Sequence, residues 1–433
     1  MFKIINGNMI EELDMFEENS IDSIVTDPPY ELNFMSKCWD NSGISFQKET
    51  WKKCFRVLKP GGYLLAFGAP RLQHRIACAI EDAGFEIRDT IMWIYGSGFS
   101  KSMNLSKQFD KRGNSDMSDV WRGFGTSLKP SYEPIIMSRK PVEGTVVDNV
   151  VKYGVGGINI DECRIPLESD YQYKETSRKG RSDAAVFNSN SCGFDNSKNT
   201  VASADPSGRF PANVILTYGD SDYAEVCGGF PNSGTVNTGK HDNLDGIVCS
   251  NKETYMISFD KQQVFSNYNN SGSACRYFYC PKASNRDRDE GLDNFETKQA
   301  TGGGGGIGDY LNDVNSASGK YGSEKAPHKN YHPTVKPTSL MQYLVRLVSP
   351  KGATILDPFM GSGSTGKAVA YENNDRDANY NFIGIELSKE YCEIADARIK
   401  FAMNDKQKLE CCKDEHHKNK EQSDTYELNG KLF

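Results

Sequence analysis

Short apolar runs alternate with amphipathic segments along the first 140 residues of the chain. Runs rich in Ile, Val, Leu and aromatic residues predict β-strands at 2–5, 20–26, 63–68, 86–96 and 131–141. Helical spacing of apolar positions predicts helices at 46–58 and 72–84. The first helix is expected to stop at Lys59-Pro60-Gly61-Gly62 and the second at Gly84. This order of strand–helix–strand units indicates a parallel-type sheet with helices on both of its faces.

The same alternation returns near the C-terminus. It predicts a helix at 337–352, a strand at 353–357 that leads into a glycine-rich turn, a helix at 367–374, and a strand at 382–385 followed by a helix that reaches residue 403. Together the two regions predict an α/β fold with a doubly wound, Rossmann-like sheet and helices on both of its faces.

Between Pro141 and His332 the chain is dominated by Gly, Ser, Asn and Asp. Its strongest strand patterns are 208–218 and 275–284, and the glycine-rich run 301–309 is typical of a flexible loop. A polar insert of this length is typical of a recognition module that is partly disordered. After residue 404 the chain is highly charged, which predicts a disordered tail.

The composition, with 37 % hydrophobic and 25 % charged residues, is that of a globular protein in water. No apolar run approaches the roughly 18 residues of a membrane span, and the N-terminus lacks a signal-peptide pattern, so we expect a cytoplasmic protein with no membrane partner. The net charge of −7 argues weakly against a nucleic-acid partner. A local basic surface nevertheless suffices for phosphate binding, and Lys and Arg cluster at 107–112, 122–129, 139–140 and 174–181.

Twelve cysteines are scattered along the chain, and in a reducing compartment we expect them to be free thiols. Cys411 and Cys412 lie near His416 and His417 in the tail, but this spacing is a weak signal for a zinc site. We therefore predict no metal.

Two motifs follow predicted strands, at the edge where open α/β sheets bind their ligands. They are DPPY at 27–30 and DPFMGSGSTG at 357–366. In the second motif, glycines let the backbone of a strand-to-helix turn approach a ligand closely. The turn lacks the lysine of a phosphate-binding P-loop and begins with an acid, which favours a cationic centre over phosphate. Glu386 ends the next strand, where an acid is suited to the hydroxyls of a ribose. A nucleoside ligand is predicted, with a plain tight turn as the alternative.

DPPY is the more specific motif. Its two prolines fix the backbone and remove two N–H donors, so that a carbonyl and the Asp27 carboxylate are both left as acceptors. Two acceptors that converge on an NH₂ group can bind both of its hydrogens and direct its lone pair at an electrophile. Tyr30 offers a ring face for a base taken out of the double helix. A rigid Asp-Pro turn without chemistry is the alternative.

Taken together, the two motifs resemble those of the DNA amino-methyltransferases, which use S-adenosylmethionine. DPPY precedes the glycine-rich turn, with a long insert between them, and this order resembles the β class, a circular permutation of the methyltransferase sheet. The segments IINGNMIEEL, VLKPGGYLLAFG and HPTVKPTSLMQYLV also fit that class. The resemblance covers roughly residues 1–140 and 330–400.

The resemblance implies roles for individual positions. The catalytic turn would consist of Asp27, Pro28, Pro29 and Tyr30, with Asp27 and the Pro28 carbonyl on the target amine and Tyr30 stacked on the base. For the cofactor, the resemblance implies that Asn8 lies near its adenine, Thr334 and Lys336 near its methionine end, and Glu386 on its ribose. Further residues implied to line the cofactor are Asp27, Asp357, Phe359, Gly361 and Gly363. Asn8 stands where an Asp is more usual in the class.

The domains implied are a catalytic half at 1–141, an inserted target-recognition region at 142–332, an S-adenosylmethionine-binding half at 333–403 and the tail at 404–433. The insert, with the basic stretch at 107–122, would recognise double-stranded DNA. A homodimer and an accompanying restriction endonuclease remain open as partners.

The activity implied is site-specific methylation of adenine N6 in DNA, by direct displacement on a flipped base. Cytosine N4 is the nearest alternative, because both amines present the same geometry. Asp27 favours adenine, since the cytosine enzymes more often carry Ser there. A non-catalytic DNA-binding relative and a methyltransferase for protein or RNA amines are further alternatives, which the intact motifs and the long insert disfavour.

Overall fold

The structure is a computed structural model that describes residues 1–32, 42–95, 102–166, 207–217, 285–297 and 329–404, together with four two-residue strands between 232 and 273. Several predicted features lie outside these described residues, namely the strand at 275–284, the glycine-rich loop at 301–309, the basic cluster at 174–181 and the tail beyond residue 404.

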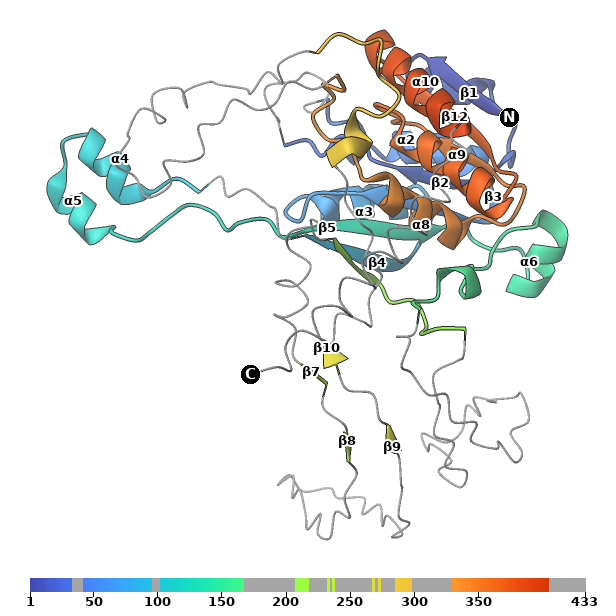
Figure 1. Ribbon diagram of the computed structural model, residues 1–433, viewed down its shortest axis with the longest axis horizontal. Coiled ribbons are helices and arrows are strands. Elements are labelled where there is room, and N and C mark those ends of the chain that lie inside the picture. Colours follow the sequence, from blue (N-terminus) through green and yellow to red (C-terminus); the bar gives the residue numbers. More distant parts are fainter. Residues whose placement is uncertain are drawn as a thin grey trace, which may run out of the picture.

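Eight strands form one sheet (Figure 1). They are β1 (Phe2–Asn6), β2 (Ile21–Thr26), β3 (Leu58–Phe67), β4 (Glu86–Tyr95), β5 (Tyr132–Arg139), β6 (Val214–Thr217), β11 (Thr354–Asp357) and β12 (Asn381–Glu386). Their order is β1-β12-β11-β2-β3-β5-β4-β6. Neighbours are parallel, except that β5 runs antiparallel to both β3 and β4. Two short antiparallel pairs, β7 (Asn232–Ser233) with β10 (Gly272–Ser273) and β8 (Val236–Asn237) with β9 (Asn267–Tyr268), form separate ribbons.

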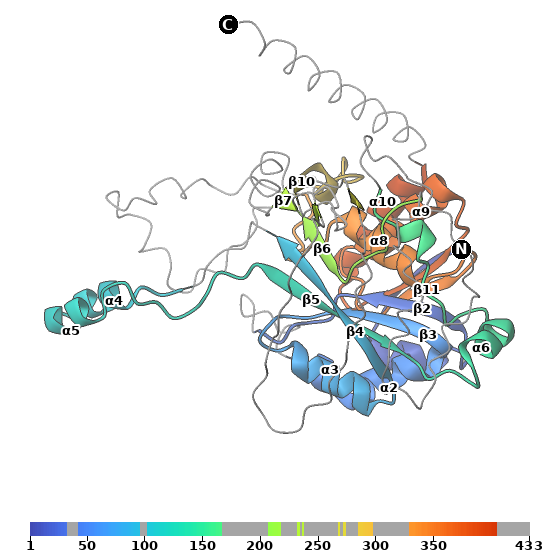
Figure 2. The ribbon, with the colours of Figure 1, turned by 90° about the horizontal axis from the view of Figure 1, so that it is seen from below.

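Helices cover both faces of the sheet (Figure 2). The helices α1 (Met9–Glu12), α2 (Lys48–Val57) and α3 (Gln73–Asp82) pack on one face, and α8 (Thr338–Val348), α9 (Ser364–Arg376) and α10 (Lys389–Asn404) pack on the other. Successive strand residues point to opposite faces, so Ile24 belongs to the first core and Val25 to the second. This arrangement confirms the predicted doubly wound α/β sheet.

The N-terminal and C-terminal regions of the chain meet at the pairing of β2 with β11, in the middle of the sheet. Ile355 pairs with Ser23, and Leu356 pairs with Ile24. Because both strands run in the same direction, DPPY and the glycine-rich turn emerge side by side at one edge. The permuted order of the two motifs is thus compatible with a single continuous sheet.

The structure differs from the sequence expectations in four places. Strand β5 runs antiparallel to β3 and β4, whereas the alternating pattern predicted a parallel-type sheet, because the connection from β4 turns the chain back. Lys59-Pro60-Gly61-Gly62 follows the end of α2, as predicted, but lies within β3, because Gly61 and Lys140 extend the pairing with β5 through backbone hydrogen bonds. Helix α6 (Val146–Tyr153) was not predicted, although Thr145 and Asp148 form a capping box at its start. The connection from β4 to β5 contains α4 (Leu105–Lys111) and α5 (Ser115–Val120).

Residues 102–128, here called the arm, lie away from the sheet in both views (Figures 1 and 2). Its two helices pack against each other, with a hydrogen bond of 2.8 Å between Ser106 and Ser118. Large apolar side chains remain exposed, among them Phe124 at 56 % and Leu128 at 93 %. The arm therefore has little core of its own.

Within the described part of the chain, none of the helices combines the length and apolar character needed to cross a membrane. Among the same residues, no three His, Cys, Asp or Glu side chains are grouped as a metal site would require.

Candidate active site

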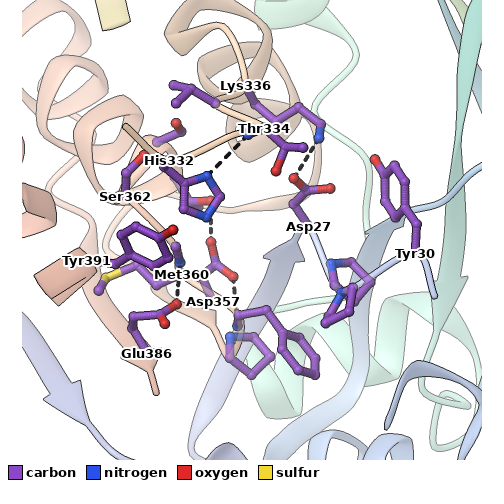
Figure 3. A pocket seen from close by; sticks show the side chains of 18 of the residues that line it. Asp27, Tyr30, His332, Thr334, Lys336, Asp357, Met360, Ser362, Glu386 and Tyr391 are labelled. Atoms are coloured by element: carbon purple, nitrogen blue, oxygen red, sulfur yellow. Dashed lines mark hydrogen bonds and ion pairs between the residues drawn. The ribbon is translucent and has the colours of Figure 1, made fainter. Parts of the chain in front are cut away.

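A cavity of about 820 Å³ opens where β2, β11 and β12 end (Figure 3). This volume lies within the range of about 300–1,000 Å³ that is typical of small-molecule sites. Most of the residues selected from the sequence line it: Asn8, Asp27, Pro28, Pro29, Tyr30, Thr334, Lys336, Asp357, Phe359, Gly361 and Glu386. Gly363 is not among the lining residues. It begins α9 and packs against α10.

The Asp27 carboxylate occupies the floor of the DPPY turn directly after β2. Its Oδ2 accepts a hydrogen bond of 2.5 Å from the Lys336 ammonium. Its Oδ1 is buried and has no hydrogen-bond partner among the described residues. The turn is held by the Ser45 hydroxyl, which donates to the Pro29 carbonyl over 2.5 Å. An unsatisfied buried acceptor is costly, so Oδ1 is suited to a donor that a ligand supplies.

Lys336, Glu133 and Tyr30 form a connected cluster beside Asp27. The Tyr30 hydroxyl donates to Glu133 over 2.8 Å, and the Lys336 ammonium lies 3.5 Å from the same carboxylate. Burial raises the pKa of Asp27, although the charge of Lys336 opposes this. Burial would lower the pKa of Lys336, but the adjacent carboxylates of Asp27 and Glu133 outweigh it and raise that pKa. The lysine is therefore a cation in this structure.

The glycine-rich turn is locked to the neighbouring strand by Asp357. Its carboxylate accepts hydrogen bonds from the Thr26 hydroxyl at 2.7 Å, the Thr365 hydroxyl at 2.6 Å and the Phe359 N–H at 3.2 Å. Burial raises the pKa of Asp357 to about 7, against the effect of these hydrogen bonds. Gly361 has a φ of 55°, and a Cβ there would lie 2.9 Å from Nε2 of His332. The turn thus requires glycine at this position.

Glu386, at the end of β12, is the acid next to this turn. Its carboxylate accepts hydrogen bonds from the Gly361 N–H at 2.9 Å and the Ser388 N–H at 2.8 Å. Burial raises the pKa of Glu386. Two backbone donors orient both oxygens, and each oxygen keeps a lone pair for a further donor. Asn8 follows the adjacent strand β1 and also lines the cavity, where its side-chain oxygen accepts from the Ile10 N–H at 3.0 Å and caps α1.

A sequence profile of the N6/N4 methyltransferases, described as DNA methylase, matches residues 21–397. The chain belongs to the DNA methylase family. This membership confirms the resemblance to the amino-methyltransferases.

Several known methylases are similar to the chain. M.HindIII of Haemophilus influenzae, a type II methyltransferase, is 26 % identical over 200 residues, which are 36 % of this chain and 64 % of M.HindIII. M.HpaI of Haemophilus parainfluenzae, also a type II methyltransferase, is 26 % identical over 276 residues, which are 62 % of this chain and 75 % of M.HpaI. Among solved structures, the cytosine-N4-specific PvuII DNA methyltransferase matches with a TM-score of 0.40 and 11 % identity, covering 92 % of this chain and 86 % of that one.

Three residues of the candidate site were not singled out from the sequence. Glu133 is the second residue of β5, and the only signal for it was the presence of a charged residue in a largely apolar run. His332 is half-buried by its exposed surface, and its removal from water, with the positive charge of Lys336, lowers its pKa to about 3, so the ring is neutral. The Thr334 N–H lies 3.4 Å from Nδ1 of that ring, and Tyr391 packs against it with ring centroids 4.6 Å apart.

The methylase turn is also supported from behind by a buried ionic cluster around Asp287. The ammonium of Lys367 lies 2.5 Å from Asp287, and Arg398 donates to the Ser362 carbonyl over 2.6 Å. Both cations are fully buried. Asp287 also accepts from the hydroxyl and the N–H of Thr338, at the start of α8. A segment near the end of the predicted insert is thus tied to the glycine-rich turn.

Proposed function

We propose that this DNA methylase transfers a methyl group from S-adenosylmethionine to N6 of adenine in double-stranded DNA. The observation that carries the proposal is the unpartnered Oδ1 of Asp27, buried in the same cavity as the glycine-rich turn and Glu386. An amine donor completes the hydrogen bonding of Asp27, and a nucleoside suits the other end of the cavity.

The residues present fit S-adenosylmethionine. Glu386 is oriented by two backbone N–H groups and can accept from the ribose hydroxyls. Phe359, Met360 and Tyr391 supply apolar and aromatic walls for the adenine ring. The cofactor would bring a methyl group on a positively charged sulfur, and the acids Asp27, Asp357 and Glu386 line the cavity that would receive it.

The protein's own groups would prepare the base amine for this methyl group. Asp27 and the Pro28 carbonyl would accept the two amine hydrogens, which turns the nitrogen lone pair out of conjugation with the ring. Tyr30, anchored through its hydroxyl to Glu133, would offer its face to the flipped base. The amine nitrogen would accept the methyl group in one displacement, the sulfur would leave as a neutral thioether, and the proton that the nitrogen then loses would pass to the Asp27 carboxylate or to solvent. No covalent enzyme intermediate is required, because the amine itself is the nucleophile.

Adenine is preferred to cytosine on the resemblance alone, because Asp rather than Ser occupies the first position of DPPY. The test is product identification. The purified protein is incubated with double-stranded DNA from a methylation-free host and labelled S-adenosylmethionine, and the digested nucleosides are analysed by mass spectrometry. We expect N6-methyladenine. N4-methylcytosine would establish the alternative base, and unmethylated DNA beside methylated RNA or protein would overturn the proposal.

We further propose that DNA is recognised by residues 142–332 together with the arm. The described parts of that range include α6 and β6, which belong to the main fold, so recognition by the insert would fall largely on the rest of the range. The arm connects β4 with β5 next to the cavity, since Tyr95, Pro130 and Glu133 all line the cavity. It exposes Lys107 and Arg112 to solvent.

A double variant in which glutamine replaces both Lys107 and Arg112 is expected to bind DNA with lower affinity. Its affinity should also depend less steeply on salt. Each lost phosphate contact should reduce the slope of log affinity against log salt by about 0.9, because one counterion fewer is released. Fluorescence anisotropy between low and moderate salt measures this slope. The matched control replaces Lys3 on the edge strand β1 and Lys351 just before β11, two exposed lysines outside the arm. Equal slopes for both double variants would argue against the arm.

A further inference from the structure

Lys336 is an unusual residue for the floor of a cavity. Its side chain is 6 % exposed, and its ammonium lies 2.5 Å from Asp27 and 3.5 Å from Glu133. The same ammonium lies 5.2 Å from the centre of the Tyr30 ring and 5.0 Å from that of Phe67. The catalytic-turn aspartate is thus paired with a desolvated cation from a segment about 300 residues away in the chain.

Other groups around Asp27 do not replace this cation. Glu133 on β5 is an acid whose charge adds to burial in raising the pKa of Asp27, and the charge of Asp27 adds to burial in raising the pKa of Asp357 at the end of β11. Tyr30 is hydrogen-bonded to Glu133, and burial raises its pKa far above the ordinary value. His332 is neutral, because burial lowers its pKa to about 3. Lys336 is therefore the positive group among these neighbours of Asp27.

A purely structural role accounts poorly for the pair. Two charges removed from water lose solvation, and replacing a buried ion pair by apolar residues of similar volume is often neutral or stabilising. Methionine has the length of the lysine stem and would fill the same space between Tyr30 and Phe67. The cation binds one oxygen of Asp27, while the other oxygen of this cavity-lining residue is buried and has no hydrogen-bond partner among the described residues, and this asymmetry points instead to the chemistry.

We propose that Lys336 is a positioning residue that holds Asp27 as a carboxylate and turns it so that Oδ1 alone faces the target amine. This inference rests on the proposed function, because it concerns the same amine. It differs from the role implied by the family resemblance, in which Lys336 lies near the methionine end of the cofactor. A protonated Asp27 would carry a hydroxyl in place of one acceptor, and would compete with the amine instead of binding it.

The test compares Lys336→Met with Lys336→Arg by single-turnover methylation between pH 6 and 9. The wild type and Lys336→Arg should show a flat profile, because Asp27 remains ionised. In Lys336→Met, burial without a cation should raise the pKa of Asp27 further. The rate should then fall by about tenfold for each pH unit below that pKa and recover as the pH rises through it. Cofactor affinity, measured by calorimetry, should be unchanged in both variants.

A second measurement needs no cofactor and no DNA. Thermal unfolding of the wild type, Asp27→Asn, Lys336→Met and the double variant forms a cycle. In the wild-type background, Asp27→Asn should lower the melting temperature, because it removes the nearest carboxylate from the buried ammonium of Lys336. In the Lys336→Met background, the same substitution should have little effect.

The outcomes separate this inference from the proposed function. If the wild type methylates DNA but the Lys336→Met variant shows a flat pH profile, only the inference about Lys336 is overturned. A large loss of cofactor affinity in Lys336→Met would also overturn it, in favour of the cofactor role. A wild type that methylates no DNA would instead overturn the proposed function.

Discussion

Replacing Asp27 with alanine is expected to lower the single-turnover rate of methyl transfer by about 100- to 1,000-fold. Removal of one preorganised hydrogen-bonding group from an active site typically has this effect. Asp27 supplies one of two acceptors for the amine, and its Oδ1 is already buried without a partner. S-adenosylmethionine binding, measured by calorimetry, should remain close to that of the wild type, because Asp357 and Glu386 are untouched.

Asp27→Asn is the matched control. It preserves the size of the side chain but removes the charge that pairs with Lys336 and replaces one acceptor by a donor. We expect a rate between those of the wild type and Asp27→Ala. Melting temperatures of both variants check that the fold survives the loss of the ion pair. An Asp27→Ala enzyme that methylates at the wild-type rate would rule out the proposed mechanism.

Replacing Glu386 with alanine should weaken S-adenosylmethionine binding on the order of 100-fold. A hydrogen bond to a charged group contributes about 1.5–3 kcal/mol, and each 1.4 kcal/mol corresponds to a factor of ten in affinity. The substitution removes the acceptors for the ribose and also releases the N–H groups of Gly361 and Ser388, which the carboxylate now orients. Calorimetric titration with the cofactor measures the effect.

The control for charge is Glu393→Ala, which removes an exposed carboxylate from α10, near the same strand end. It should leave the affinity unchanged. At saturating cofactor the Glu386→Ala enzyme should regain much of its methylation rate, since the catalytic turn is intact. Unaltered affinity in Glu386→Ala would show that the ribose is bound elsewhere.

The parallel part of the sheet could be predicted because its strands are buried on both faces and appear as continuous apolar runs. Ile24 and Val25 face opposite cores, yet both are required to be apolar. The reversed direction of β5 could not be predicted in the same way. Its apolar run specifies burial but not direction, and the connection that turns the chain includes the arm, which has no strong apolar pattern.

The motif residues could be found because each has an unusual chemistry for its place at the end of a strand. Glu133 was not selected at all, and Lys336 was selected only through the family resemblance and for a contact to the cofactor. Each is an ordinary charged residue in the sequence, and each acquires its significance from contact with Asp27 or Tyr30, which are far away along the chain. Such pairings depend on strand order, and a single sequence reveals strand order only through resemblance to a family.

The pairing of β2 with β11 sets the order in which this protein can be assembled during translation. The Thr26 hydroxyl binds the carboxylate of Asp357, 331 positions further along the chain. When the ribosome has finished the DPPY turn, the strand that must lie beside it does not yet exist. The catalytic half must therefore wait, with one edge of β2 unpaired, until β11 (Thr354–Asp357) has been synthesised. Contacts of such high sequence separation slow folding, so the nascent protein gains its complete cavity only after the glycine-rich turn and β12 have followed β11 out of the ribosome.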